Sequence, residues 1–165
     1  LHSPHYVEKF NVLQHPQYTQ QLCEAMAEKF KDARIETVVG PVTGGILLAH
    51  ETGKALVTRA IFTERVDGKM TFRRGFSLRE GERVLIVEDI VTTGGSIKEV
   101  IDVVKAAGAV PVAVSMLVDR SGGKATFGDV PATALLTMDV ETYTPEHCPL
   151  CAKGIPMTKR GRTGK

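Results

Sequence analysis

The sequence has 165 residues, which is within the range of one domain, and its hydrophobic content of 42% and charged content of 24% are ordinary for a globular protein. A formal net charge of +2 gives no global field that would attract nucleic acid or a membrane surface. No apolar run approaches the roughly 18 residues of a transmembrane helix, and no signal-peptide pattern is visible. We therefore expect a cytoplasmic protein with neither nucleic acid nor membrane as a partner.

The first third of the chain predicts two helices with a strand between them. Apolar residues recur at helical spacing between Gln17 and Asp32. Residues Ile35 to Gly40 are a strand candidate, and the turn formed by residues 41–45 leads into a helix from about Ile46 to Thr52. We expect Gly53 to close this helix, because glycine commonly follows the last helical turn. These elements form a first β-loop-α unit.

The middle of the chain predicts two further strands. Ala55 to Phe62 is the second strand, and the polar, basic stretch after it carries Gly68 and Gly75, which suggests a mobile hairpin. Val84 to Val87 is the third strand, and its four consecutive apolar residues are typical of a strand buried on both faces.

The remaining elements repeat the alternation of strand and helix. A helix is predicted from Ser96 to Ala107, followed by Gly108 and by strands at Val110 to Val118 and Thr133 to Met138. Such alternation predicts a parallel sheet with right-handed crossovers. The helix carries an apolar stripe that should pack on this sheet: Ile97, Val100, Ile101 and Val104.

The predicted domain organisation is simple. We expect residues 1–165 to form one domain, with residues 144–165 as an irregular, basic tail. Because the chain begins at Leu1 without a Met, we also expect that an N-terminal element is missing.

The segment from Val84 to Ser96 carries most of the functional information. The third strand runs into two acids, Glu88 and Asp89, and then into a loop of hydroxyl-bearing residues and glycines that leads into a helix. Open α/β sheets bind ligands at the carboxyl ends of their strands, and the unpaired N–H groups of a helix N-terminus favour an anion. This loop therefore predicts a phosphate site beside two carboxylates.

Two adjacent carboxylates and a phosphate loop suit a ribose 5-phosphate, because carboxylates accept charge-assisted hydrogen bonds from vicinal hydroxyls. Side chains at 88 and 89 would point to opposite faces of a continued strand, so we expect the strand to stop at the acids. The alternative is an acidic pair that merely caps a buried strand.

The whole segment resembles the phosphoribosyl pyrophosphate (PRPP) signature of the type I phosphoribosyltransferases. The resemblance implies their α/β fold, an open, mainly parallel twisted sheet with helices on both faces and a flexible hood. It implies that Glu88 and Asp89 hold the ribose hydroxyls and that the following loop holds the 5-phosphate, while a loop after the first strand grips the pyrophosphate. The implied PRPP-binding residues are Thr43, Gly44, Glu88, Asp89, Ile90, Val91, Thr92, Thr93, Gly94, Gly95 and Ser96.

Three other segments resemble the orotate phosphoribosyltransferases in particular. Leu1 to Lys9 is similar to their base-binding segment, Asp119-Arg120 matches their Asp-Arg pair, and residues 148–156 are similar to their C-terminus. The resemblance implies that Arg120, Thr92 and Tyr6 contact orotate. A guanidinium can bind a planar carboxylate through two parallel hydrogen bonds, and purines offer no carboxylate.

Residues 63–76 would be the flexible hood, shared between the subunits of a homodimer. Together with Asp89, the resemblance implies Arg65 and Lys69 as catalytic residues, with Arg73 and Arg74 as helpers. The alternative is a solvated basic hairpin. Gly44 stands where many orotate enzymes carry a Lys, so Mg²⁺ is expected to supply part of the positive charge. We expect this Mg²⁺ to bind through PRPP, with no metal ligand assigned among the protein side chains.

The expected reaction is transfer of the phosphoribosyl group from PRPP to orotate, giving orotidine 5′-monophosphate and pyrophosphate for UMP synthesis. Two alternatives stay open: a transferase for another base, and a PRPP-sensing regulator without turnover. Arg120 favours orotate over purines, and a regulator would be expected to carry a nucleic-acid-binding domain.

One further pattern could bind a metal. His147, Cys148 and Cys151 provide part of a zinc site, but a full site needs four ligands and the other cysteine, Cys23, is distant in the sequence. We therefore expect a C-terminal turn without metal. The scattered histidines, His2 among them, are expected to pack or to lie on the surface.

Overall fold

The computed structural model describes residues 2–156. The chain divides into two compact units. The larger unit comprises Glu8–Met138, and the smaller unit joins the two ends of the chain, Leu1–Val7 and Asp139–Lys165. Part of the predicted basic tail, residues 157–165, lies outside the described residues.

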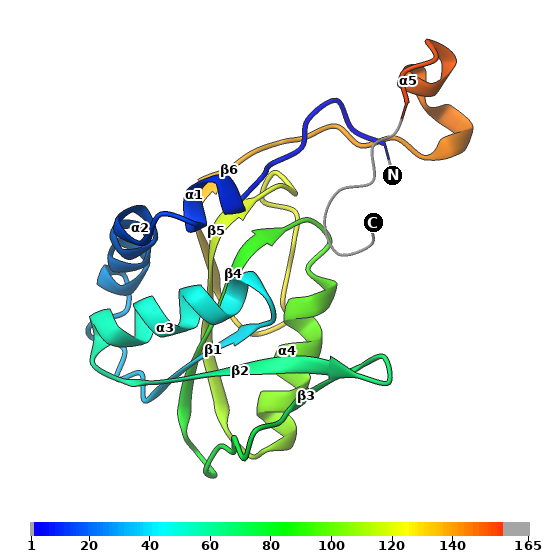
Figure 1. The fold of residues 1–165 in the computed structure, drawn as a ribbon. Coiled ribbons are helices and arrows are strands. Elements are labelled where there is room, and N and C mark those ends of the chain that lie inside the picture. Colours follow the sequence, from blue (N-terminus) through cyan, green and yellow to red (C-terminus); the bar gives the residue numbers. More distant parts are fainter. Residues whose placement is uncertain (1, 157–165) are drawn as a thin grey trace. The chain divides into compact units, whose positions relative to one another are not determined.

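The larger unit is built on a six-stranded sheet in the order β3-β2-β1-β4-β5-β6 (Figure 1). All neighbouring strands are parallel except β3, which pairs with β2 as an antiparallel edge strand. This arrangement confirms the predicted open, mainly parallel sheet. The strands are β1 (Thr37–Pro41), β2 (Arg59–Val66), β3 (Lys69–Phe72), β4 (Arg83–Val91), β5 (Val110–Asp119) and β6 (Ala132–Thr137).

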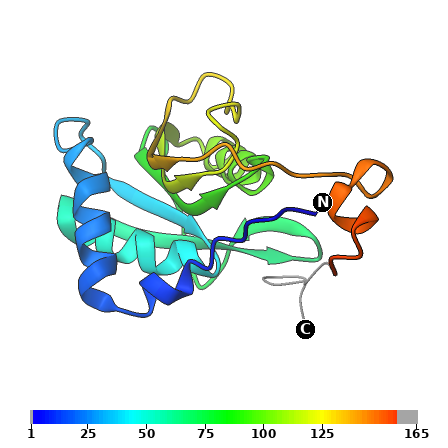
Figure 2. The same cartoon turned by 90° about the horizontal axis from the view of Figure 1, so that it is seen from above.

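Helices cover both faces of this sheet, as Figures 1 and 2 show from two directions. They are α1 (Phe10–Leu13), α2 (Pro16–Glu28), α3 (Gly44–Leu56) and α4 (Gly95–Ala106). Successive residues of β4 alternate between the two cores, because side chains of a strand point alternately to its two faces. Val84 and Ile86 pack in the core beside α4, and Leu85 and Val87 pack in the core beside α2 and α3.

Helix α4 follows its sequence prediction closely. Ile97, Val100, Ile101 and Val104 are all buried in the core on one face of the sheet. Gly108 follows the helix with a φ of 78°, a left-handed conformation that glycine adopts without steric cost. The predicted hairpin is also present, because β2 and β3 pair across the turn between Val66 and Lys69.

The boundary predicted around Gly53 is wrong. Helix α3 continues through Gly53 to Leu56 and ends at Val57, whose φ is 55°. Gly53 is instead a packing residue, since a Cβ there would lie 3.0 Å from the Cβ of Ala60 on the neighbouring strand. Ala55 and Leu56 therefore belong to the helix, and β2 begins only at Arg59.

The prediction that the third strand stops at the acids is also wrong. Strand β4 continues through Glu88 and Asp89 to Val91. Its backbone stays paired with β5, with Glu88 opposite Met116 and Val91 opposite Asp119. Hydrogen bonding with β5 therefore extends β4 beyond its apolar residues, so that Glu88 and Asp89 are themselves part of the strand.

The described part of the smaller unit has two short helical turns within the segment predicted as an irregular tail. A 3₁₀ turn covers Pro145–His147 and α5 covers Pro149–Ala152. The N-terminal segment joins this unit through a pair of backbone hydrogen bonds between His2 and Tyr143, at 2.9 and 2.7 Å.

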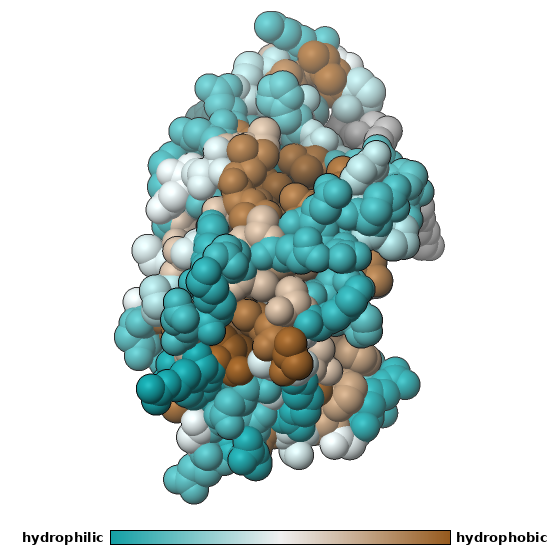
Figure 3. Space-filling model, turned by 90° about the vertical axis from the view of Figure 1, so that its left-hand side faces the viewer, coloured by the Kyte–Doolittle hydropathy of each residue, from teal (hydrophilic) through white to brown (hydrophobic). Residues whose placement is uncertain are grey.

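Polar side chains cover much of the surface on the side of α2 and α3, and apolar atoms gather there in separate patches (Figure 3). Large exposed apolar side chains on the first three helices of the larger unit are Phe10, Val12, Tyr18 and Leu47. Within residues 2–156, no helix has the length and apolar character that spanning a bilayer requires.

Candidate active site

Two loops of the larger unit meet at the carboxyl ends of its central strands. The first, residues 41–45, follows β1 and leads into α3, and the second, residues 92–94, follows β4 and leads into α4. Because β1 and β4 are parallel neighbours, both loops lie at the same edge of the sheet. The first loop meets strand β4 at Gly44 and Asp89, where a Cβ on residue 44 would lie 1.8 Å from Asp89 Oδ2.

Asp89 is the centre of this arrangement and is only 3% exposed. Its Oδ1 atom accepts a hydrogen bond of 2.6 Å from the backbone N–H of Ile90. The ammonium of Lys9 lies 2.6 Å from Oδ2, close enough for an ion pair but outside the geometry of a hydrogen bond, so Oδ2 is buried without a hydrogen-bond partner. Such an atom has acceptor capacity left for a ligand.

Glu88 is buried beside Asp89. Burial and, second, the negative charge of Asp89 raise the pKa of the Glu88 carboxyl to about 8. Its Oε1 atom accepts a hydrogen bond of 3.0 Å from the backbone N–H of Asp89. A carboxyl that keeps its proton at neutral pH can donate a hydrogen bond as well as accept one, which distinguishes it from an ionised neighbour.

The loop after β4 presents hydroxyls and backbone N–H groups. Thr92, Thr93 and Gly95 are exposed. Gly94 has a φ of 76°, and a Cβ there would lie 2.8 Å from the ring of Phe127. The first backbone hydrogen bond of α4 is donated by the N–H of Lys98 to the carbonyl of Gly94. The backbone N–H groups that precede Lys98 at the start of this helix therefore have no acceptor within the helix. This is the geometry of an anion site.

Ile90 and Val91, two of the predicted PRPP residues, lie at the end of β4 together with Glu88 and Asp89 and not in the loop after it. The side chain of Val91 is 2% exposed and packs in the core. Contact of either residue with PRPP stays a prediction.

Arg120 follows β5, and its backbone N–H donates to the carbonyl of Val91 at 2.8 Å. This bond holds Arg120 beside the end of β4. The carboxylate of Asp119 organises the next turn by accepting hydrogen bonds from the N–H groups of Ser121 and Gly123 at 2.7 and 2.9 Å. Burial opposes ionisation of Asp119, but these hydrogen bonds outweigh it and lower its pKa.

The predicted hood corresponds to the end of β2, β3 and the turn after it. Arg65 forms an ion pair of 2.7 Å with Glu99 on α4, and Arg74 forms one of 3.0 Å with Glu64. Lys69 and Arg73 are exposed. Two of the four basic residues are thus already paired with carboxylates of the same unit.

Comparison with known proteins agrees with this geometry. The family model described as phosphoribosyl transferase domain matches residues 10–127. The orotate phosphoribosyltransferase of Desulforamulus reducens is 54% identical over 160 residues, which covers 97% of this chain and 83% of the relative.

The chain belongs to the orotate phosphoribosyltransferase family.

Solved structures show the same fold. The adenine phosphoribosyltransferase of Rhodothermus marinus superposes with a TM-score of 0.65 at 24% identity, covering 81% of this chain and 86% of that one. The orotate phosphoribosyltransferase of Aeropyrum pernix superposes with a TM-score of 0.64 at 23% identity, covering 80% and 78%. At these identities the likeness concerns the fold, and it confirms the type I phosphoribosyltransferase architecture expected from the sequence.

As an orotate phosphoribosyltransferase, the chain departs from the expected pattern at Gly44, and the structure gives a physical reason. The carboxylate of Asp89 occupies the space that a side chain at this position would enter. A cation nevertheless lies at the same place, because Lys9 reaches Asp89 from the segment before α1.

Lys9 is part of the segment that resembles the base-binding region, but the sequence does not predict its contact with Asp89. The two residues are 80 positions apart, and no local sequence pattern indicates that they meet. Tyr6 belongs to the smaller unit and is 48% exposed, so its predicted contact with orotate stays a prediction.

Proposed function

We propose that the protein transfers the 5-phosphoribosyl group of PRPP to orotate, giving orotidine 5′-monophosphate and pyrophosphate in pyrimidine biosynthesis. The observation that carries this proposal is the sequence Glu88-Asp89 at the end of β4, continued by an exposed hydroxyl and glycine loop at the N-terminus of α4. The identity to curated orotate phosphoribosyltransferases supports orotate as the acceptor.

In this proposal Asp89 holds the ribose hydroxyls and the loop holds the 5-phosphate, while Glu88 lies on the opposite face of the continued strand. Asp89 accepts hydrogen bonds from the ribose hydroxyls through Oδ2, which is ion-paired with Lys9 but has no hydrogen-bond donor. Glu88, protonated at neutral pH, is able to donate as well as accept. The hydroxyls of Thr92, Thr93 and Ser96 and the free N–H groups at the start of α4 surround the phosphate.

The pyrophosphate would lie against residues 41–45, with Thr43 exposed and Gly44 buried beside Asp89. Lys9 supplies a positive charge there, and Arg65 and Lys69 would reach this site from the hood of the other subunit in the proposed dimer. Asp89 Oδ2 is also a carboxylate oxygen of the kind that Mg²⁺ prefers, which fits an ion brought in by PRPP. Such an ion would neutralise charge on the departing pyrophosphate.

Arg120 is proposed to bind the carboxylate of orotate, with Thr92 beside the base. The bond from Arg120 N–H to Val91 fixes the start of this side chain relative to the acidic strand. The reaction would proceed through a transition state with oxocarbenium character. The protein then acts by positioning, by stabilising charge and by excluding water through closure of the hood.

We also propose a cytoplasmic homodimer in which the hood reaches the partner's site. Exposed apolar side chains on α1, α2 and α3 support an association surface on the larger unit. Free thiols at Cys23, Cys148 and Cys151 support a reducing compartment.

The substrate assay tests the proposal directly. Pyrophosphate release is measured with PRPP and Mg²⁺ against orotate, adenine, guanine, xanthine and uracil. We expect release with orotate alone. Release with a different base would identify a transferase of other specificity, and PRPP binding without release from any base would identify a regulator.

Two variants separate the two halves of the site. Asp89→Asn should lower kcat/KM by about 100-fold or more, because it removes charge from the ribose and pyrophosphate site. Arg120→Ala should raise the KM for orotate by about 10- to 100-fold, the worth of a hydrogen bond to a charged group, and leave the KM for PRPP nearly unchanged. Asp129→Asn is the control, since Asp129 is exposed and pairs with Lys105 outside the site. Near-wild-type kinetics in both site variants would remove these assignments.

A further inference from the structure

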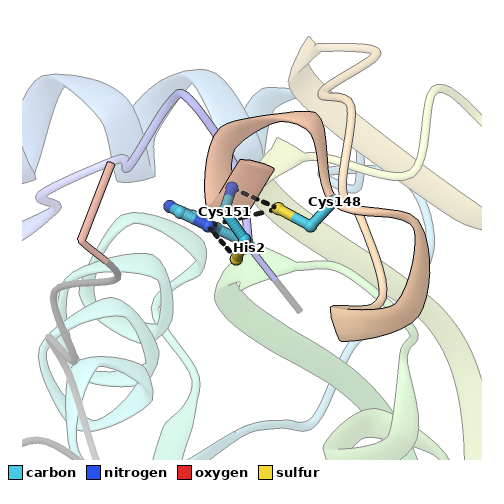
Figure 4. A group of neighbouring side chains, drawn as sticks. All are labelled: His2, Cys148 and Cys151. Atoms are coloured by element: carbon cyan, nitrogen blue, oxygen red, sulfur yellow. Dashed lines mark hydrogen bonds between the residues drawn. The ribbon is translucent and has the colours of Figure 1, made fainter. Parts of the chain in front are cut away.

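The smaller unit contains a cluster of three metal-type donors that the transferase reaction does not use. The ligand atoms of His2, Cys148 and Cys151 all lie within 4.8 Å of one another (Figure 4). The Nδ1 atom of His2 is 3.3 Å from Cys148 Sγ and 3.4 Å from Cys151 Sγ. The imidazole therefore faces both sulfurs through one nitrogen.

The backbone brings these residues together from opposite ends of the chain. Two hydrogen bonds with Tyr143 hold His2 against the C-terminal segment. The short helix α5 turns the chain after Cys148, so that Cys151 returns to it and its backbone N–H donates to Cys148 Sγ at 3.3 Å. His147 is adjacent to Cys148 in the sequence but is not part of the cluster: in the described residues it is His2, 146 positions before Cys148, that completes it.

The distances match those between ligands of one zinc ion. With Zn–S of about 2.3 Å and Zn–N of about 2.0–2.1 Å, tetrahedral geometry places a nitrogen about 3.5 Å from a sulfur. The two observed nitrogen–sulfur distances, 3.3 and 3.4 Å, are close to this value. His2 and Cys148 are also buried, at 7% and 6% exposure, whereas Cys151 lies at the surface.

We infer that His2, Cys148 and Cys151 bind a zinc ion that fastens the N-terminal segment to the C-terminal segment of the smaller unit. Two thiolates and an imidazole are the donors zinc prefers, and they are poor ligands for the hard cation Mg²⁺. The described residues add no fourth side chain to the group, so water or a donor from elsewhere completes the tetrahedron at the exposed Cys151 side. The site does not depend on the proposed transferase reaction.

The expected consequence of zinc binding is a closed junction between two segments that are far apart in sequence. A link that closes a long loop restricts the unfolded chain more than a link within one turn. The zinc-mediated link between His2 and the Cys148–Cys151 turn would therefore stabilise the smaller unit. The stability of the sheet in the larger unit would not change.

Metal content tests the site. The full chain, untagged and reduced, is loaded with Zn²⁺ in the presence of excess Mg²⁺, dialysed, and analysed for zinc per chain. We expect one tightly held zinc in the wild type, and loss of most of it in His2→Gln, Cys148→Ser and Cys151→Ser. His147→Gln and Cys23→Ala are the matched controls and should keep the metal. No zinc in the reduced wild type, or equal zinc in the wild type and the Cys148→Ser/Cys151→Ser double variant, would overturn the site.

Cobalt substitution tests the ligand set independently of affinity. Co²⁺ bound by thiolates shows a sulfur-to-metal charge-transfer absorption, which should be present in the wild type and in His147→Gln. It should weaken in each single cysteine variant and vanish in the double variant. Loss of the band in His147→Gln with retention in His2→Gln would overturn the assignment of His2. Circular dichroism of each variant establishes that the larger unit is still folded.

Limited proteolysis tests the role of the junction. Removal of zinc by a chelator should expose residues 139–156 to cleavage, while the larger unit stays resistant, and added Zn²⁺ should restore protection. Equal cleavage with and without bound zinc would overturn the fastening role.

Discussion

The two loops at the active edge of the sheet, residues 41–45 and 92–94, follow the same plan but achieve it differently. Each comes after a buried parallel strand and leads into a helix that begins with glycine. In the first loop, Gly44 is needed because Asp89 fills the space beside it. In the second, Gly94 packs against Phe127, but the hydroxyls of Thr92 and Thr93 are exposed, and Gly95, which begins α4, is open. The first loop is therefore limited by packing at Gly44, and the second keeps exposed groups that are available to a ligand.

The largest loss of stability and activity should come from adding a methyl group at Gly44, in the loop of residues 41–45. In Gly44→Ala the added Cβ would meet Asp89 Oδ2 at 1.8 Å, so the carboxylate has to move. We expect a loss of about 1–3 kcal/mol in the free energy of unfolding. Displacing Asp89 should also lower kcat/KM by about 100-fold.

Gly95→Ala is the matched control for stability, since its Cβ would meet only Thr93 Oγ1, at 3.9 Å. Its free energy of unfolding should stay within about 1 kcal/mol of the wild type or rise, because alanine is the better helix former. Urea denaturation of both variants measures the difference. Equal destabilisation would show that the two loops are packed alike.

The second effect concerns the pH dependence of the acids between the loops. Glu88 has its pKa raised to about 8, so the folded protein keeps a proton that the unfolded chain releases near pH 4.5. The contribution of this carboxyl to the free energy of unfolding is complete below pH 4.5 and is lost as the pH rises toward 8. The free energy of unfolding falls by at most about 1.4 kcal/mol per pH unit in this range.

Glu88→Gln removes this titration. Urea unfolding at several pH values between 5 and 8 should show the wild type losing stability relative to the variant as pH rises, with the other titrating groups cancelling in the difference. Parallel curves would contradict the raised pKa.

The smallest change in stability and kinetics should come from the hood, which contacts helix α4 through Arg65 and Glu99. Arg65 is paired with Glu99 on α4, and both side chains are partly exposed, at 26% and 41%. Glu99→Gln should change the free energy of unfolding by less than about 1 kcal/mol and, by releasing Arg65, lower the KM for PRPP by about two- to fivefold.

Glu64→Gln releases Arg74 instead and is the comparison for this variant. If Arg65 is the residue that reaches the pyrophosphate, Glu99→Gln should have the larger effect on the KM. An equal or larger effect of Glu64→Gln would transfer the role to Arg74.

Local patterns predicted much of the fold. The stripe of Ile97, Val100, Ile101 and Val104 identified α4 and its buried face, because helical periodicity reports which side of a helix meets the core. Prediction failed where packing decided. Gly53 lies inside α3 and packs closely against Ala60, so its glycine serves a close contact and not the end of the helix. Strand β4 passes through Glu88 and Asp89 because β5 continues beside it.

The α/β alternation, the acidic strand with its phosphate loop, and the likeness to the orotate phosphoribosyltransferases can be recognised in the sequence, because each depends on residues that are neighbours along the chain. The pairing of Lys9 with Asp89, the need for glycine at position 44 and the meeting of His2 with Cys148 and Cys151 depend on the folded chain. These contacts link residues 45 to 149 positions apart. At such separations the path of the backbone, and not local periodicity, determines which side chains meet.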